Sequence, residues 1–141
     1  MLIQRINRTD AEKVFQVVKN SISTAITVGQ VVCYDYVTDA DGVGVTTPTA
    51  QLLPLVAGIV ESTSIAASDF GLIQIYGHNA NALVQGGTDV ATGDQLAAKN
   101  AVFSLIKAAA TLNDAEKAFF VAGEDFSTST AAAKKVFVRA L

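Results

Sequence analysis

Apolar and polar residues alternate over short runs along most of this chain, and glycines separate the runs. Alternation with a period of two is typical of β-strands that bury one face. The densest region is residues 56–96, where three predicted strands and several glycine turns follow one another closely. The pattern predicts a small β-domain organised around this region.

The first part of the chain predicts two strands and a loop. Residues 12–20, EKVFQVVKN, carry apolar side chains on both sides of the run, which favours a strand covered on much of both faces over a helix. In residues 25–37, Gly29 indicates a turn or bulge before a strand from Val31 to Val37. Residues 39–44, DADGVG, have the composition of a loop.

The turn at Gly29 has a counterpart at Gly93. In residues 26–32, ITVGQVV, and residues 90–96, VATGDQL, an apolar residue is followed three positions later by glycine and then by a polar residue. Glycine tolerates a positive φ, and a neighbouring Asp side chain can bond back to the turn backbone. We therefore expect each copy to start a new strand.

The middle of the chain contains a proline that limits its strands. Pro54 cannot donate to a central ladder, so a strand is expected to begin at Leu55 or Val56. Gly58 within it indicates a close approach of another backbone. Residues 72–76, LIQIY, predict a further strand, which a turn at residues 77–79 separates from a continuation at residues 82–84.

The C-terminal third predicts a variable segment and a final strand. Residues 107–118 are alanine-rich and form either a plain loop or one or two helical turns with Asn113 or Asp114 as N-cap. Residues 135–137 repeat the Lys-Val-Phe of residues 13–15. From this repeat we predict that the two terminal strands are neighbours that close the sheet.

These elements predict an all-β fold with at most one short helix. We expect a small β-barrel or sandwich-like single domain at residues 12–141, preceded by an extended N-terminal arm at residues 1–11. The arm carries Leu2, Ile3 and Ile6 with Arg5 and Arg8. It is either a frayed terminus or a segment that docks on a partner surface.

Composition limits the partners of this domain. Half of the residues are apolar and only 16% are charged, which favours burial of one face against copies of the chain or other partners. The net charge of −3 argues against binding to nucleic acid, because proteins that bind phosphate backbones usually carry a basic patch.

Membrane insertion and secretion are not expected either. The apolar runs are shorter than the roughly twenty residues that cross a bilayer, and two arginines precede any long apolar core, unlike a secretory signal. The single cysteine, Cys33, excludes an internal disulfide and is expected to be buried rather than nucleophilic.

Candidate metal ligands are sparse. Asp35, Asp39 and Asp41 lie close together, but a helix-flanked calcium loop needs a closing acid twelve residues after the first ligand. No acid follows until Glu61, and predicted strands flank the loop. We therefore expect no metal site.

Catalytic constellations are also not expected. The lone His78 has no serine in a nucleophile frame. Glu124 and Asp125 are adjacent in a predicted strand, so they point to opposite faces. Residues 86–87, Gly-Gly, lack the lysine of a phosphate loop, and Lys99 lacks the neighbours of a biotinyl or lipoyl carrier lysine. The sequence therefore predicts neither an enzyme nor a cofactor.

Taken in order, several segments resemble those of a known family. EKVFQVVKN, ITVGQVVCYDY, PLVAGIVESTSIAASDFGLIQIYGHNANALV, VATGDQL and KKVFVRAL together resemble the small head decoration, or cement, proteins of tailed bacteriophages. The resemblance covers residues 11–106 and the last strand. It rests on the pattern of strands and glycine turns.

The resemblance implies a β-rich protein without catalytic residues or cofactors. Such a protein binds the outer surface of the phage head, contacts the major capsid protein, often as a homotrimer, and stabilises the shell against internal DNA pressure. It would be made in the bacterial host cytoplasm and reside in the virion.

Interface residues follow from the apolar and basic positions. For the capsid interface we select Leu2, Ile3, Arg5 and Arg8 of the arm. For self-association we select Phe70, Ile75, Tyr76 and Leu83, although the pattern favours a core position over an interface position for each of them.

An alternative of a different class is a carbohydrate- or receptor-binding β-module of a phage fibre or cell surface. Sugar sites typically use aromatic platforms, and this chain has no Trp and only three Tyr.

Overall fold

The computed structural model describes residues 11–38, 40–86, 89–109, 118–127 and 129–140. Within them, the helical structure is one 3-10 turn, η1 (Leu53–Leu55), and every other element is a strand. The strands are β1 (Lys13–Asn20), β2 (Ile26–Thr27), β3 (Val31–Tyr34), β4 (Gly44–Thr46), β5 (Val56–Val60), β6 (Ser64–Ile65), β7 (Phe70–Val84), β8 (Gln95–Ala98), β9 (Leu105–Lys107), β10 (Phe120–Ala122) and β11 (Ala132–Arg139).

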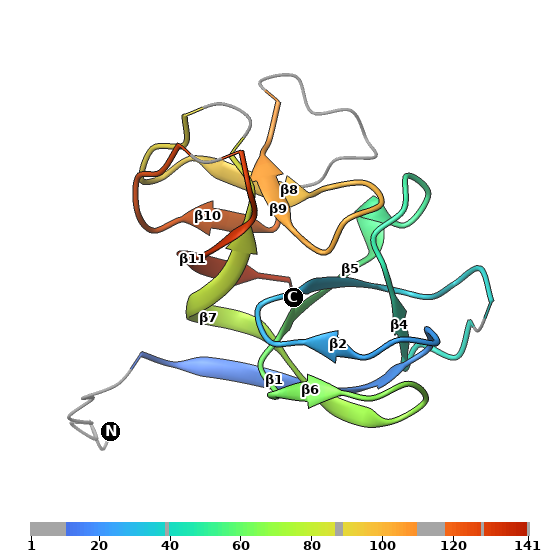
Figure 1. Ribbon diagram of the computed structural model, residues 1–141. Coiled ribbons are helices and arrows are strands. Elements are labelled where there is room, and N and C mark those ends of the chain that lie inside the picture. Colours follow the sequence, from blue (N-terminus) through green and yellow to red (C-terminus); the bar gives the residue numbers. More distant parts are fainter. Residues whose placement is uncertain (1–10, 39, 87–88, 110–117, 128, 141) are drawn as a thin grey trace, which may run out of the picture.

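The main strands form two closed rings that share β7 (Figure 1). In the first ring, β1, β4, β3, β5 and β7 pair in this order, and β7 pairs back with β1. In the second ring, β7, β11, β10, β8 and β9 pair in this order, and β9 pairs back with β7. The predicted all-β single domain is confirmed, in the form of two small fused barrels.

The two rings have the same topology. Each has an opening strand, a hairpin, a fourth strand paired with the first strand of the hairpin, and a fifth strand that closes on the opening strand. The second strand of the hairpin runs parallel to the opening strand in both rings, in the pairs β1–β4 and β7–β9. The chain therefore repeats one arrangement, and β7 ends the first copy and opens the second.

The paired glycine turns belong to this repeat. Gly29 (φ +83°) and Gly93 (φ +91°) start β3 and β8, the equivalent hairpin strands. Each glycine amide donates to the last residue of the fourth strand, at 2.9 Å and 2.8 Å. The side chain of the next residue, Gln30 or Asp94, accepts a hydrogen bond from the amide three residues earlier, at 2.7 Å and 2.8 Å. Both predicted turns are confirmed.

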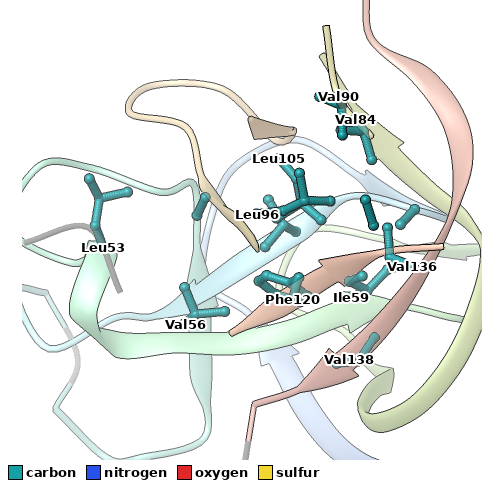
Figure 2. Close-up of a cluster of buried hydrophobic side chains, with 14 of the residues drawn as sticks. Leu53, Val56, Ile59, Val84, Val90, Leu96, Leu105, Phe120, Val136 and Val138 are labelled. Carbon is teal, nitrogen blue, oxygen red and sulfur yellow. The ribbon is translucent and has the colours of Figure 1, made fainter. Parts of the chain in front are cut away.

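Each ring encloses a hydrophobic core. The first core lies inside the first ring and is covered by β2 and β6; it comprises Val18, Ile26, Val32, Val45, Ala57, Val60, Ile65 and Ile73. The second core lies inside the second ring and extends over the outer face of β3 and β5 (Figure 2). Because β3 and β5 form a wall between the two cores, β5 is buried along its whole length.

Two predictions about β5 are confirmed. Pro54 lies in η1, and β5 begins at Val56. Gly58 adopts a φ of +155°, and a Cβ atom there would collide with the backbone oxygen of Gln74 on β7. A residue without a side chain is needed because the two strands cross closely.

The predicted turn at residues 77–79 is wrong, because β7 continues through it as one strand of fifteen residues. The strand bends at Gly77 (φ +102°), where β1 and β11 meet it on opposite edges. The buried Gln74 side chain donates to the carbonyls of Tyr76 (3.0 Å) and His78 (3.1 Å). These bonds satisfy the backbone carbonyls at the bend. The chain therefore does not reverse at Gly77, and β7 continues with β11 as its partner in place of β1.

Two further predictions need correction. The strand expected to reach Val37 ends at Tyr34, because the Asp35 carboxylate accepts hydrogen bonds from the amides of Val37 (3.2 Å) and Thr38 (2.9 Å) and holds a turn. The terminal strands β1 and β11 each pair with β7, and the described residues show no ladder between them. The predicted N-cap residues Asn113 and Asp114 lie outside the described residues.

The two equivalent turns provide a matched test of the fold. A Cβ atom at Gly29 would collide with the backbone oxygen of Asn81, whereas one at Gly93 would meet nothing within 4 Å. We expect Gly93→Ala to cost about 1–2 kcal/mol, the penalty of a positive φ. Gly29→Ala should cost about 1–3 kcal/mol more, because backbone must also move. Urea unfolding of both variants measures the difference, and equal losses would contradict the close packing at Gly29.

Candidate functional site

Exposed apolar side chains gather on the outer face of the first ring, where β1 pairs with the first half of β7. Val17 of β1 lies directly opposite Leu72 of β7, and they are 58% and 42% exposed. Phe15 and Phe70 stand two residues away on their strands, so they project from the same face, and they are 44% and 64% exposed. We call these four residues the β1–β7 face.

The face is exposed because of how the rings join. Further along the outside of the first ring, β3 and β5 are covered by the second core. The pairing of β1 with residues 70–74 lies beyond this cover, so alternate residues point into the first ring, as Val18 does, and the others point to solvent. Large apolar side chains that cluster on one exposed face usually mark an interaction site.

The second ring shows that the topology does not require such a face. Its equivalent strands, β7 and β11, carry Asn81, Ala133 and Lys135 at exposed positions. Phe137 is the large apolar side chain among them, and its ring packs edge-on against Tyr76 with centroids 5.3 Å apart. One ring thus closes without a cluster of exposed large apolar side chains, so closing a ring does not by itself require the β1–β7 face.

The structure separates the four residues predicted for self-association. Phe70 belongs to the β1–β7 face. Ile75 packs against the first core, and Tyr76 packs against Phe137. Leu83 is half-buried beside the Gly29 turn, where its amide donates to the Gly29 carbonyl at 2.8 Å.

The sequence analysis missed three residues of the face, Phe15, Val17 and Leu72. The interpretation of β1 as a strand covered on both faces is wrong for its outer face. Their alternation was visible, but alternation alone does not say which face the second ring covers. The predicted capsid residues Leu2, Ile3, Arg5 and Arg8 lie outside the described residues.

The acids predicted near the Asp39 loop are engaged by backbone. Asp41 accepts hydrogen bonds from the amides of Gly44 and Val43, both at 2.8 Å, and these bonds lower its pKa. Asp35 holds its own turn, and Asp39 lies outside the described residues. No group of three or more metal-binding side chains occurs in the part of the chain that the structure describes.

Two shallow depressions lie elsewhere on the surface. One, of about 470 Å³, is lined by Asp89, Val90, Ala91, Asp125, Phe126 and Ser127. Its Asp125 accepts hydrogen bonds from the amide (2.6 Å) and hydroxyl (2.8 Å) of Thr92, which lower the pKa of the carboxyl. The other, of about 490 Å³, is lined by Asp35, Val37, Thr38, Thr46, Thr49, Ala50, Gln51 and Leu52.

Reactive groups suited to catalysis do not converge in either depression. Cys33 is fully buried in the second core, and burial raises the pKa of its thiol to about 12. A thiol with such a pKa stays protonated and unreactive at neutral pH. His78 lies on β7 opposite Phe137 and is not among the residues that line the two depressions. Among the described residues, no helix has the length and apolar character needed to cross a bilayer.

The comparisons with known proteins give a structural likeness only. No protein-family model matches the chain, and no curated protein matches it. Among solved structures, the chain is similar to the N base of head fiber gp8.5 in bacteriophage phi29, with a TM-score of 0.50 and 14% sequence identity. The match covers 90% of this chain and 94% of that chain.

At this identity the likeness shows a shared fold. It spans both rings, because it covers nearly the whole length of each chain. The similar protein belongs to a phage head, which agrees in part with the resemblance found in the sequence. It is described as a head fiber, and not as a decoration or cement protein.

Proposed function

We propose that this chain is a bacteriophage structural protein that binds the outer surface of the head and stabilises the shell as a decoration, or cement, protein. The observation that carries the proposal is the fold likeness to a phage head fiber base over 90% of the chain. The order of strand segments and glycine turns in the sequence supports the same class independently. In this proposal the partner is the major capsid protein, and the location is the virion.

The proposal includes self-association, with a homotrimer as the expected state. The β1–β7 face supports it, because its four side chains expose apolar surface on the order of a few hundred Å², as much as the largest patch on a typical monomer. A stable interface buries about 800 Å² per partner. The face would form its apolar centre, with more polar surface around it.

The N-terminal arm is proposed as the capsid contact. Residue 11 lies two positions before the start of β1, whose outer face bears Phe15 and Val17. In this arrangement one end of β1 joins the capsid-binding segment, and its outer surface joins neighbouring copies. Many weak contacts of this kind give avidity over a repetitive shell.

A second candidate is binding of a carbohydrate or receptor. Tyr36 favours it, because the residue is 49% exposed, its ring lies edge-on to that of Tyr34 with centroids 6.2 Å apart, and its neighbours Asp35 and Val37 line one of the depressions. Exposed aromatic rings provide flat platforms for sugars.

Self-association can be tested on the β1–β7 face. We expect Val17→Lys combined with Leu72→Lys to leave the fold intact and shift the protein from trimer to monomer, because two charges would be buried at the centre of the interface. Sedimentation equilibrium measures the mass. Val28→Lys, at a residue 40% exposed in the Gly29 turn, is the matched control and should remain trimeric. Trimers of the double variant would contradict the role of the face.

Capsid binding can be tested on the arm. Deletion of residues 1–10 should leave a folded protein that no longer co-sediments with mature heads, because the apolar and basic residues of the arm are lost. Circular dichroism checks the fold of the deletion variant. Unchanged co-sedimentation would refute the role of the arm.

The two candidate functions predict different ligands for the full chain. A decoration protein should co-sediment with mature heads and bind nothing on a glycan panel. A carbohydrate-binding module should bind the panel, and Tyr36→Ala should abolish that binding. Glycan binding without head binding would overturn the proposed function.

A further inference from the structure

Three side chains from distant parts of the sequence meet beside the bend of β7. The Glu61 carboxylate, just after β5, accepts a hydrogen bond on Oε1 from the Lys13 ammonium of β1 at 3.0 Å. Its other oxygen, Oε2, accepts one from the side-chain amide of Asn79 on β7 at 3.1 Å. A single carboxylate therefore binds a primary amine through one oxygen and a carboxamide through the other.

The Asn79 side-chain amide is buried and hydrogen-bonded through both its nitrogen and its oxygen. The residue is 1% exposed, and its Nδ2 also donates to Oε1 of Gln74 at 2.9 Å. Its Oδ1 accepts a hydrogen bond from the backbone amide of Asn81 at 2.8 Å. A donor in this position polarises the carbonyl and stabilises the negative charge that develops on its oxygen when a nucleophile attacks the carbon.

The amine has a base in contact with it. The Lys13 and Glu61 side chains are 33% and 26% exposed, so the pair lies at the surface and is partly shielded from solvent. An amine attacks a carbonyl only in its neutral form, and a carboxylate in hydrogen-bond contact can take the proton. Glu61 touches both nitrogens whose protons must move.

We propose that Lys13, Glu61 and Asn79 form a self-catalysed isopeptide cross-link between β1 and β7. Glu61 takes a proton from the Lys13 ammonium, and the neutral Nζ attacks Cγ of Asn79 to form a C–N bond. The Asn81 amide stabilises the oxyanion. Glu61 then protonates Nδ2, the Cγ–Nδ2 bond breaks, and ammonia leaves. Glu61 takes the second proton that Nζ loses on becoming an amide nitrogen, and the departing ammonia accepts this proton as ammonium, which restores the Glu61 carboxylate. No oxidant or other reactant is required.

The cross-link would join the start of the first ring to the strand that both rings share. Hydrogen bonds between β1 and β7 break one at a time when the strands are pulled apart, but an amide bond does not. The reaction occurs once per molecule and is distinct from turnover of a substrate. The inference goes beyond the proposed function and does not depend on it.

Intact-mass spectrometry of the full chain, produced in bacteria and denatured before measurement, tests the proposal directly. We expect a mass lower than the sequence mass by one ammonia. Tandem spectra of a protease digest should place the link between Lys13 and Asn79. A wild-type protein at its full sequence mass after prolonged incubation would overturn the proposal.

Variants separate the cross-link from other losses of ammonia. Lys13→Arg removes the nucleophile and Glu61→Gln removes the base, so both should show the full sequence mass. Lys107→Arg is the matched control, because Lys107 also pairs with a carboxylate, that of Asp94 at 2.6 Å, which accepts its other hydrogen bond from a backbone amide and not from a carboxamide. It should keep the loss. Cyclisation of an asparagine would survive Lys13→Arg, so a persistent loss in that variant would overturn the proposal.

Discussion

The architecture of this protein depends on the double use of β7. The first half of the strand closes one ring on β1, and the second half opens the other ring with β11. The change from β1 to β11 as the partner of β7 requires a bend, and backbone groups at the bend lose their regular hydrogen-bond partners. Gly77 allows the positive φ, and the buried Gln74 amide binds the carbonyls on either side of it. A buried carbonyl left without a donor costs about 1–3 kcal/mol, so the bend depends on the hydrogen bonds from the Gln74 side-chain amide.

Sharing one strand also determines which surfaces are buried. The second core reaches over β3 and β5 of the first ring, which turns an outer face into an internal wall. The cover ends before the pairing of β1 with residues 70–74, and there the outer face keeps its apolar side chains. The contrast with the polar face of the second ring identifies this surface as the candidate interface. The exposed apolar face and the internal wall thus follow from the same asymmetry between two rings of equal topology.

The proposed function agrees with the small share of charged residues in the chain and with the structural roles of its acids. Only 16% of its residues are charged, and several of its acids are used to hold turns. A protein that covers a regular shell needs a rigid body and surfaces for neighbours, and it needs no reactive pocket. The fused rings provide the rigid body, since each strand of one ring is held by two neighbours. The grouping of Lys13, Glu61 and Asn79 beside the bend would add a covalent bond where the rings join.

Local patterns in the sequence determined the all-β character, the repeated glycine turns at Gly29 and Gly93, and the start of β5 after Pro54, because backbone preferences act over a few residues. They did not determine that Gly77 bends a continuous strand, since glycine allows either a reversal or a bend, and partners far along the chain decide between them. Phe70 was found as a candidate from its apolar character. Phe15, Val17 and Leu72 joined it only in the tertiary structure, because the placement of the second ring decides which apolar face is covered.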